Sequence, residues 1–206
     1  MGVWNNYWVL TNKNFIFSIG LRMHHRIVFS VYESFFDGLN LDNPSIIELG
    51  SGCGELTARL VKKYGGSATL VDNSRKALNS AKSVFNDYSI NVKLLERDLF
   101  KFDPKEKYDI VHSEGLIEHF IGDDQNKIVH AHKKCAKKGG YVLISVPRPA
   151  WYYRIAKGFL EMIGKWPFGY ENAMNKYALK KVMENNGMKV IRFAERARYS
   201  FALAKI

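Results

Sequence analysis

The stretch Ile46-Ile47-Glu48-Leu49-Gly50-Ser51-Gly52-Cys53-Gly54 begins as an apolar run and then breaks into three alternating glycines. A second apolar run follows and ends on Asp72, eighteen residues after the last of these glycines. A buried strand, a glycine turn, a helix and a second strand that ends on a carboxylate are the parts of a nucleoside-binding βαβ unit. No other pattern in the chain restricts its fold as much.

The rest of the chain continues this alternation. Apolar periodicity predicts helices over 25–36, 55–64, 75–85, 124–136 and 175–186, with strands over 45–49, 68–72, 92–96, 108–113 and 141–146. Two last strands, 188–194 and 199–204, are joined by a link too short for anything but antiparallel pairing. The sequence therefore predicts an α/β fold: a Rossmann-like, doubly wound, mainly parallel seven-stranded sheet with a C-terminal antiparallel hairpin.

The length of 206 residues suits a single domain. We divide it into an N-terminal helical cap region (1–44), the alternating core, and an insertion (148–170) after the fifth strand. No run approaches the roughly 18 apolar residues of a membrane span, and no signal peptide is recognisable, so no transmembrane segment is expected. Two cysteines are too few for a disulfide framework, and we expect a cytoplasmic protein.

The net charge of +11 is concentrated in the last third of the chain. Residues 131–206 hold sixteen Lys and Arg against four Asp and Glu, whereas residues 1–130 hold fifteen against sixteen. This asymmetry is compatible with an anionic partner, such as nucleic acid, a phosphorylated metabolite or an acidic membrane surface. A lysine-rich solvated surface explains it equally well.

The spacing of the glycine loop excludes a nicotinamide fingerprint, because Glu55 stands where the third glycine of G-x-G-x-x-G belongs. The alternating form G-x-G-x-G resembles motif I of the class I S-adenosylmethionine-dependent methyltransferases, of the type 11-like small-molecule group. Asp72 and Asp98 match that family's second-strand and third-strand acids. The stretches 108–113 and 138–147 match its fourth-strand and fifth-strand motifs, so the resemblance extends from residue 46 to the C-terminus.

The resemblance implies S-adenosyl-L-methionine as cofactor and S-adenosyl-L-homocysteine as product. It assigns the methionine part of the cofactor to the loop after the first strand, the ribose to the second strand, the adenine to the third, and the region of the transferable methyl to the fourth. The cofactor-binding residues implied are Glu48, Gly50, Ser51, Gly52, Gly54, Asp72, Asn73, Asp98, Leu99, Ser113, Glu114 and Gly115. Alternatives remain for single residues: Glu48 as an ordinary strand-end acid, and Asp98 as a surface partner of Arg97.

Glu118 and His119 are the candidate catalytic residues. Some oxygen-methylating relatives carry E-x-x-E-H here and hold a divalent metal, but Gly115 occupies the first glutamate position and Glu114 lies one residue away. We therefore predict no metal. His119 has the ordinary pKa range of a general base near neutral pH; the alternative is a Glu-His pair that only shapes the pocket.

The insertion 148–170 interleaves aromatic and basic residues. It follows the carboxyl end of a strand, so it is expected to lie over the mouth of the site. Three interpretations stay open: a lid that shapes the acceptor pocket, a platform that stacks on nucleic-acid bases, and a helix or dimer contact packed by its aromatics.

The sequence thus predicts methyl transfer to oxygen or nitrogen of a small or medium-sized acceptor. The alternatives are an RNA (tRNA or rRNA) methyltransferase, favoured by the basic last third, and a cofactor-binding module without catalysis. The acceptor and the oligomeric state are not determined by the sequence.

Overall fold

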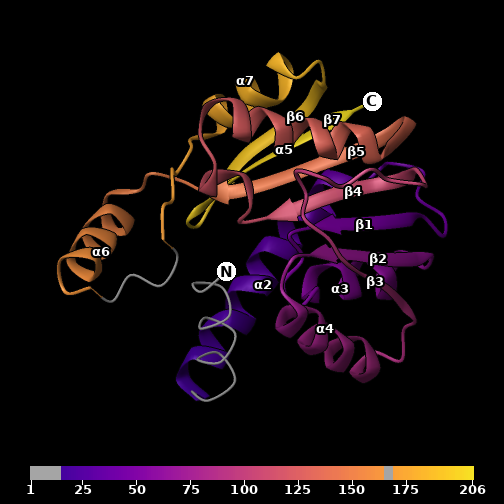
Figure 1. Ribbon diagram of the computed structural model, residues 1–206, viewed down its shortest axis with the longest axis horizontal. Coiled ribbons are helices and arrows are strands. Elements are labelled where there is room, and N and C mark those ends of the chain that lie inside the picture. Colours follow the sequence, from indigo (N-terminus) through magenta and orange to yellow (C-terminus); the bar gives the residue numbers. More distant parts are fainter. Residues whose placement is uncertain (1–14, 165–168) are drawn as a thin grey trace.

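The computed structural model describes residues 15–164 and 169–206, with side-chain surroundings from residue 23 onward except at 152 and 156. It contains a seven-stranded sheet in the order β3-β2-β1-β4-β5-β7-β6 (Figure 1). The strands are β1 (Ser45–Leu49), β2 (Ser67–Asp72), β3 (Val92–Glu96), β4 (Tyr108–Glu114), β5 (Ala136–Pro147), β6 (Lys189–Arg196) and β7 (Tyr199–Lys205). Strands β1 to β5 pair in parallel, whereas β7 runs antiparallel to both β5 and β6. The predicted fold class is confirmed.

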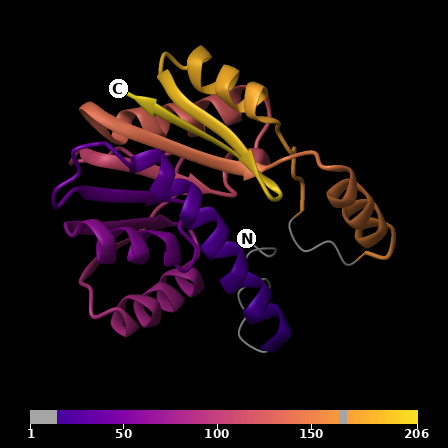
Figure 2. The same ribbon diagram turned by 180° about the vertical axis from the view of Figure 1, so that it is seen from behind.

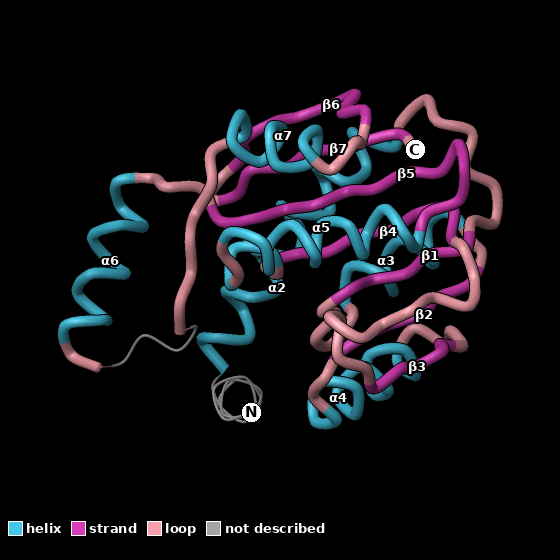
Figure 3. Tube along the Cα trace, turned by 45° about the horizontal axis from the view of Figure 1, so that its top comes forward, coloured by secondary structure: helices cyan, strands magenta, loops and turns pink. Residues whose placement is uncertain are grey.

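Helices cover both faces of this sheet. On one face lie α2 (Phe15–Phe36), α3 (Glu55–Tyr64) and α4 (Arg75–Asp87), and on the other α5 (Gly122–Cys135) and α7 (Lys176–Asn185), as the opposite views of Figures 1 and 2 show. A short 3₁₀ turn, η1 (Ile117–His119), follows β4. Helix α6 (Trp151–Met162) stands apart from these layers, beyond the ends of β4 and β5 (Figures 1 and 3).

Two apolar clusters separate the sheet from its helices. Because side chains alternate along a strand, Ile46 and Ile110 point to the α2, α3 and α4 face, whereas Ile47 and Val111 point to α5 and α7. All four of these side chains are fully buried. The same alternation determines towards which face of the sheet each polar side chain near the strand ends points.

Helix α2 begins ten residues earlier than the sequence predicted. Its buried residues recur at helical spacing and face the sheet: Val28, Val31, Tyr32, Phe35 and Phe36. Arg192 of β6 donates to the carbonyl oxygens of Ser34, Phe35 and Asp37, which satisfies acceptors that the end of a helix leaves unpaired. Residues 1–14 of the proposed cap region, and 165–168 of the insertion, lie outside the described residues.

Helix α5 passes directly into β5, although the sequence predicted a glycine-ended helix up to residue 136 and a strand only from 141. Ala136 already pairs with Tyr108, and Gly139 N–H donates to the Ile206 carbonyl at 2.6 Å. The two glycines thus lie within a strand and not at a helix end. The β6–β7 link is likewise shorter than expected, with Ala197 at a positive φ of 50° in the turn.

Among the described helices, none has the length and apolar character needed to cross a membrane.

A buried histidine makes the fold sensitive to acid. His132 of α5 is fully buried; its Nδ1–H donates to the Ile128 carbonyl and its Nε2 accepts from the Ser113 hydroxyl, both at 2.8 Å. Burial lowers the pKa of His132 from 6.5 to about 4. Its neutral form therefore contributes stability that is complete above pH 6.5 and is lost as the pH falls from 6.5 towards 4.

We expect the free energy of unfolding, measured with urea, to decrease across this interval. The decrease should be shallower in His132→Gln, because glutamine takes up no proton there. If the unfolding free energy depended on pH equally in the wild type and in His132→Gln, the assignment of this acid sensitivity to His132 would be contradicted.

Candidate active site

The candidate site lies where the strand order reverses. Strand β1 is flanked by β2 and β4, so the connections leaving β1 and β4 diverge to opposite faces, and ligands of doubly wound sheets bind at such a point. The loop after β1 (50–54) and the turn after β4 (114–116) meet here. A Cβ placed on Gly50 would lie 2.6 Å from Leu116 Cδ1, so Leu116 covers the start of the glycine loop.

The glycine loop needs its glycines. Gly50, Gly52 and Gly54 all have positive φ angles, of 63°, 54° and 69°. Such angles strain a residue with a Cβ, and a Cβ on Gly54 would also meet Leu70 Cδ1 at 2.4 Å. The loop is therefore held tightly against the sheet where it enters α3.

Asp72 joins the second strand to this loop. Its Oδ2 accepts from Gly52 N–H at 2.9 Å and its Oδ1 from Ser74 N–H at 2.8 Å. Burial raises the pKa of Asp72, while these amide hydrogen bonds act in the opposite direction. Each oxygen keeps a second lone pair, so the carboxylate suits the two hydroxyls of a ribose. Asn73 follows it and is exposed.

Two further observations fit a nucleoside ligand. The Ser51 hydroxyl in the glycine loop is buried and has no hydrogen-bond partner in the described structure, as expected where a ligand completes the site. Asp98 after β3 is exposed and accepts from Phe100 N–H at 3.0 Å. Beside it, Leu99 packs against the core, and the Phe100 ring lies 5.4 Å from that of Phe120, which forms an apolar wall for a flat base.

Glu48 lies beneath the site, in a buried chain of hydrogen bonds. Thr57 Oγ1 donates to Glu48 Oε2 at 2.6 Å and lies 2.8 Å from His112 Nε2. With the Thr57 proton given to Glu48, His112 Nε2–H is the donor to Thr57. Burial raises the pKa of Glu48 to about 8 and lowers that of His112 to about 3. The structure thus gives the Glu48 carboxyl a partner within the protein; its predicted contact with a cofactor stays a prediction.

Glu114, at the end of β4, is paired with His24 of α2, which lies ninety residues earlier in the chain. Burial alone would raise the pKa of Glu114, but His24, His25 and Arg198 outweigh it and lower that pKa. Glu114 is therefore an ionised carboxylate at the bottom of the site. The His24 ring also lies 4.9 Å from the Tyr199 ring, so helix α2 and the terminal hairpin both border this carboxylate.

The pair Glu118 and His119 lies on η1, beside the strand end. Glu118 is 1% exposed, and burial raises its pKa well above the usual value, which favours the protonated form. His119 Nδ1 hydrogen bonds to the Tyr170 carbonyl at 2.8 Å, and burial lowers the pKa of His119 below 6.5. The two side chains lie 3.8 Å apart, measured from Glu118 Oε1 to His119 Nε2.

Ser113 and Gly115, the neighbours of Glu114 in sequence, differ in where their polar groups make contact. The Ser113 hydroxyl turns away from the loop to His132, whereas Gly115 N–H donates to the Ser145 carbonyl and continues the β4–β5 pairing. A Cβ on Gly115 would lie 3.3 Å from Glu118 Oε1. The structure therefore brings Gly115, Glu114 and Glu118 together and leaves the Ser113 side chain in the core.

Sequence reasoning did not find His24, Thr57 or Tyr199. No motif marks them, because each reaches the site by packing of an element distant in sequence. The one visible signal was the doublet of His24 and His25, where the predicted helix 25–36 begins. Arg26, two residues after His24 on the same helix, is exposed beside Glu33 and Lys62.

Comparison with known proteins agrees with this geometry. Residues 46–140 match a family model described as "Methyltransferase domain". Over these residues the chain carries a methyltransferase domain, and its fold is that of the S-adenosylmethionine-dependent methyltransferases among the solved structures. Its cofactor is S-adenosyl-L-methionine. No curated protein sequence matches the chain.

Solved structures share the fold of this methyltransferase domain. Magnesium protoporphyrin IX methyltransferase from Synechocystis, with bound S-adenosylhomocysteine, is 17% identical, with a TM-score of 0.73 over 93% of this chain and 87% of that one. An S-adenosylmethionine-dependent methyltransferase from Clostridium acetobutylicum is 15% identical, with a TM-score of 0.69 over 98% of each chain. The 1,6-didemethyltoxoflavin-N1-methyltransferase of Burkholderia thailandensis is 12% identical, with a TM-score of 0.66 over 88% and 77%.

Within the described ranges, no group of three or more His, Cys, Asp or Glu side chains is placed to hold a metal ion. The metal-free reaction predicted from Gly115 stays a prediction.

The buried chain through Thr57 gives a stability test. Thr57→Val keeps the shape but removes the hydroxyl, so Glu48 and His112 both lose their partner. We expect the free energy of unfolding, from chemical denaturation, to fall by about 1–3 kcal/mol. Thr57→Ser keeps the hydroxyl and should lose less. Equal losses in the two variants would show that packing and not hydrogen bonding holds this chain.

Asp72 gives a ligand-binding test. An amide in its place accepts at one atom only and presents a donor to a backbone N–H, so Asp72→Asn should weaken binding of S-adenosylhomocysteine by about tenfold or more in calorimetry. Asp87→Asn, at the exposed end of α4, is the matched control and should bind like the wild type. Undiminished affinity in Asp72→Asn would remove the ribose assignment.

Proposed function

We propose that this chain transfers the methyl group of S-adenosylmethionine to an oxygen or nitrogen atom of a small or medium-sized acceptor. The arrangement of two carboxylates at the reversal of strand order carries the proposal. Asp72, at the end of β2, is hydrogen bonded to the glycine loop, and the ionised Glu114 ends β4, on the other side of β1. The first feature suits a nucleoside, and the second suits the ammonium group of its amino-acid part. The product would be S-adenosylhomocysteine.

Support for a small acceptor comes from the structural neighbours. One carries the name of magnesium protoporphyrin IX methyltransferase, and another was solved with 1,6-didemethyltoxoflavin and S-adenosylhomocysteine bound. Both named compounds are small molecules. We extend this substrate class, but neither compound, to the present chain.

The cofactor, when bound, supplies a sulfonium methyl group whose transfer leaves a neutral thioether. Little acid catalysis is needed on the leaving side, so the protein contributes mainly by orienting the reactants and excluding water. The loop 50–54 and Asp72 hold one reactant. The acceptor lies on the side of Glu118 and His119, near Tyr170.

His119 is the proposed base where the acceptor atom still carries a proton. In the neutral ring one nitrogen donates to a backbone carbonyl, of Tyr170 or of Gly115, and the other nitrogen is the basic atom. Its lowered pKa keeps His119 neutral at pH 7, as a proton acceptor must be. Glu118, whose pKa is raised by burial, would shape the pocket and, in its protonated form, offer a hydrogen bond rather than take the proton.

The alternatives from the sequence stay testable. The basic last third of the chain favours an RNA methyltransferase. The cofactor-binding features would also be present in a binding module without catalysis. Incubation with tritiated S-adenosylmethionine and separated cell fractions distinguishes the three. We expect label in the small-molecule fraction. Label in tRNA or rRNA would select the second function, and no label in any fraction, despite cofactor binding, the third.

The role of His119 predicts a pH profile. As His119 loses its proton, kcat/KM should rise with pH through an apparent pKa below 6.5 and then stay level. His119→Gln should lose this rising limb and at least about tenfold in kcat/KM at neutral pH. Calorimetry with S-adenosylhomocysteine supplies the control, since cofactor binding should be unchanged. Full turnover in His119→Gln would exclude it as the base.

A further inference from the structure

Helix α6 presents its apolar side to solvent. Four large apolar side chains on it are more than half exposed: Trp151 (74%), Ile155 (64%), Phe159 (57%) and Met162 (76%). Their spacing of three to four residues places them on one side of the helix. We call these four residues the α6 stripe. A helix that belonged to the core would bury such a stripe.

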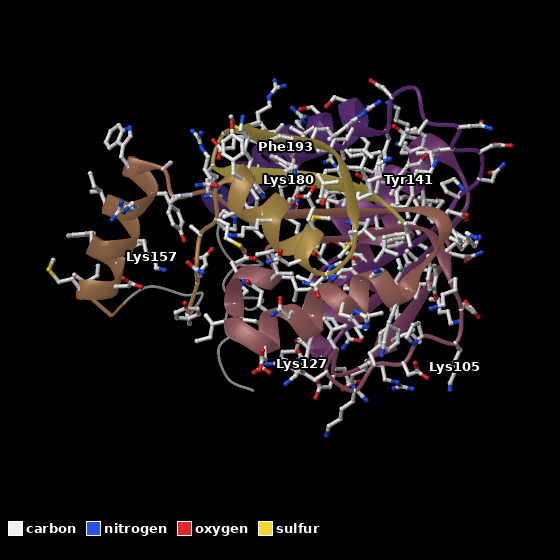
Figure 4. The ribbon with its side chains drawn as sticks, turned by 90° about the horizontal axis from the view of Figure 1, so that it is seen from above. Lys105, Lys127, Tyr141, Lys157, Lys180 and Phe193 are labelled. Carbon is white, nitrogen blue, oxygen red and sulfur yellow. The ribbon has the colours of Figure 1, made fainter. Side chains whose placement is uncertain are left out.

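The opposite side of α6 carries the polar contacts with the protein. Lys157 donates to the Glu171 carbonyl at 2.6 Å and lies 3.8 Å from the Glu161 carboxylate. Figure 4 shows Lys157 on the side of α6 that faces the rest of the molecule. Neither apolar cluster of the core includes a described residue of α6. The usual polarity of a surface helix is therefore reversed, and the exposed stripe offers a surface to an apolar partner.

Several arginines lie near the N-terminal end of helix α6. Arg154 lies on α6 and is exposed, and Arg148 precedes the helix. Arg148 N–H donates to the Arg198 carbonyl at 2.9 Å, so the β6–β7 turn, with the exposed Arg196 and Arg198, adjoins this point. The Arg148 side chain is paired with Glu195, whereas Arg154, Arg196 and Arg198 are exposed; Arg198 also helps to lower the pKa of Glu114. Within a chain of net charge +11, this end is complementary to an anionic surface.

The composition of the stripe separates two anionic partners. Nucleic acid would be bound by aromatic side chains that stack on bases, with arginines on phosphates. Ile155 and Met162, half of the stripe, offer nothing to stack, whereas all four residues can enter the boundary between headgroups and acyl chains. A helix that combines a Trp- and Phe-containing apolar side with flanking arginines is the form that lies in a bilayer interface.

Other exposed apolar side chains lie on helix α2 and on segments that follow the carboxyl ends of strands. They are Met23 on α2, Phe100 after β3, Ile121 before α5 and Tyr170, each more than two-fifths exposed. A flat apolar partner that covered α6 would thus reach towards the acceptor side of the site.

We propose that this edge of the molecule docks on an anionic lipid bilayer, with the α6 stripe in the interface and Arg154, Arg196 and Arg198 on lipid phosphates. The proposal stands independently of the methyl transfer proposed above, because the α6 stripe and these three arginines include none of the residues assigned to the cofactor or to catalysis.

The test is co-sedimentation of the full chain with phosphatidylcholine vesicles, with and without phosphatidylglycerol. We expect binding that requires the anionic lipid and weakens at high salt. The double variant Trp151→Ser/Phe159→Ser should lose about tenfold or more in lipid affinity. Tyr177→Ser/Phe193→Ser, which removes exposed aromatics from α7 and β6, is the matched control and should bind like the wild type.

A second pair of variants tests the charge. Arg154→Glu should weaken binding, whereas Lys105→Glu, far from α6 in Figure 4, should not. Binding of S-adenosylhomocysteine, expected unchanged in all four variants, shows that they are folded. The proposal fails if the chain sediments with neither vesicle, or if the stripe and control variants bind equally. It also fails if sedimentation velocity shows a dimer that the stripe variant dissociates, or if RNA binding alone depends on the stripe.

Discussion

The site depends on the hydrogen bond between Gly52 N–H and the Asp72 carboxylate. It joins the loop after β1 to the end of β2, two elements that the parallel pairing of these strands brings to one edge. The bond is available because the loop turns through left-handed conformations that glycine adopts without strain. Asp72 is held in turn by Ser74, which also caps α4. One carboxylate thus fixes the shape of the loop and faces the ligand position.

Beneath this edge, the sheet carries polar residues on both faces, and each is matched by a helix. Glu48 and His112 meet Thr57 of α3, while Ser113 meets His132 of α5. An unpaired polar group buried this deeply would cost more than its hydrogen bond returns. The helices therefore have to approach the strand ends in a defined register. This register holds the loops above them in place, so stability and the geometry of the site have a common origin.

Much of the fold could be read from the sequence, because its signals are local. The strands at 45–49 and 92–96 and helix α3 have the bounds that periodicity predicted, and Ser74 and Asn175 cap helices as their side chains suggest. The glycine loop and Asp72 were visible because close backbone approach requires particular residues at particular positions.

Where pairing with a distant segment decides the structure, the sequence was insufficient. The strand status of Gly139 and Gly140 depends on Ile206, and the partner of Glu114 comes from α2, ninety residues away. The reversed polarity of α6 was likewise invisible, since periodicity shows that a helix has an apolar side but not which way that side faces.

The central claim is that the edge formed by the loops after β1, β2 and β4 holds S-adenosylmethionine. A crystal structure of the chain grown with S-adenosylhomocysteine tests it most directly. The account predicts the ribose hydroxyls on Asp72, the amino-acid part along the loop 50–54 with its ammonium group towards Glu114, and the adenine beside Leu99. Density for the ligand at another place, or a ribose that does not touch Asp72, would contradict it.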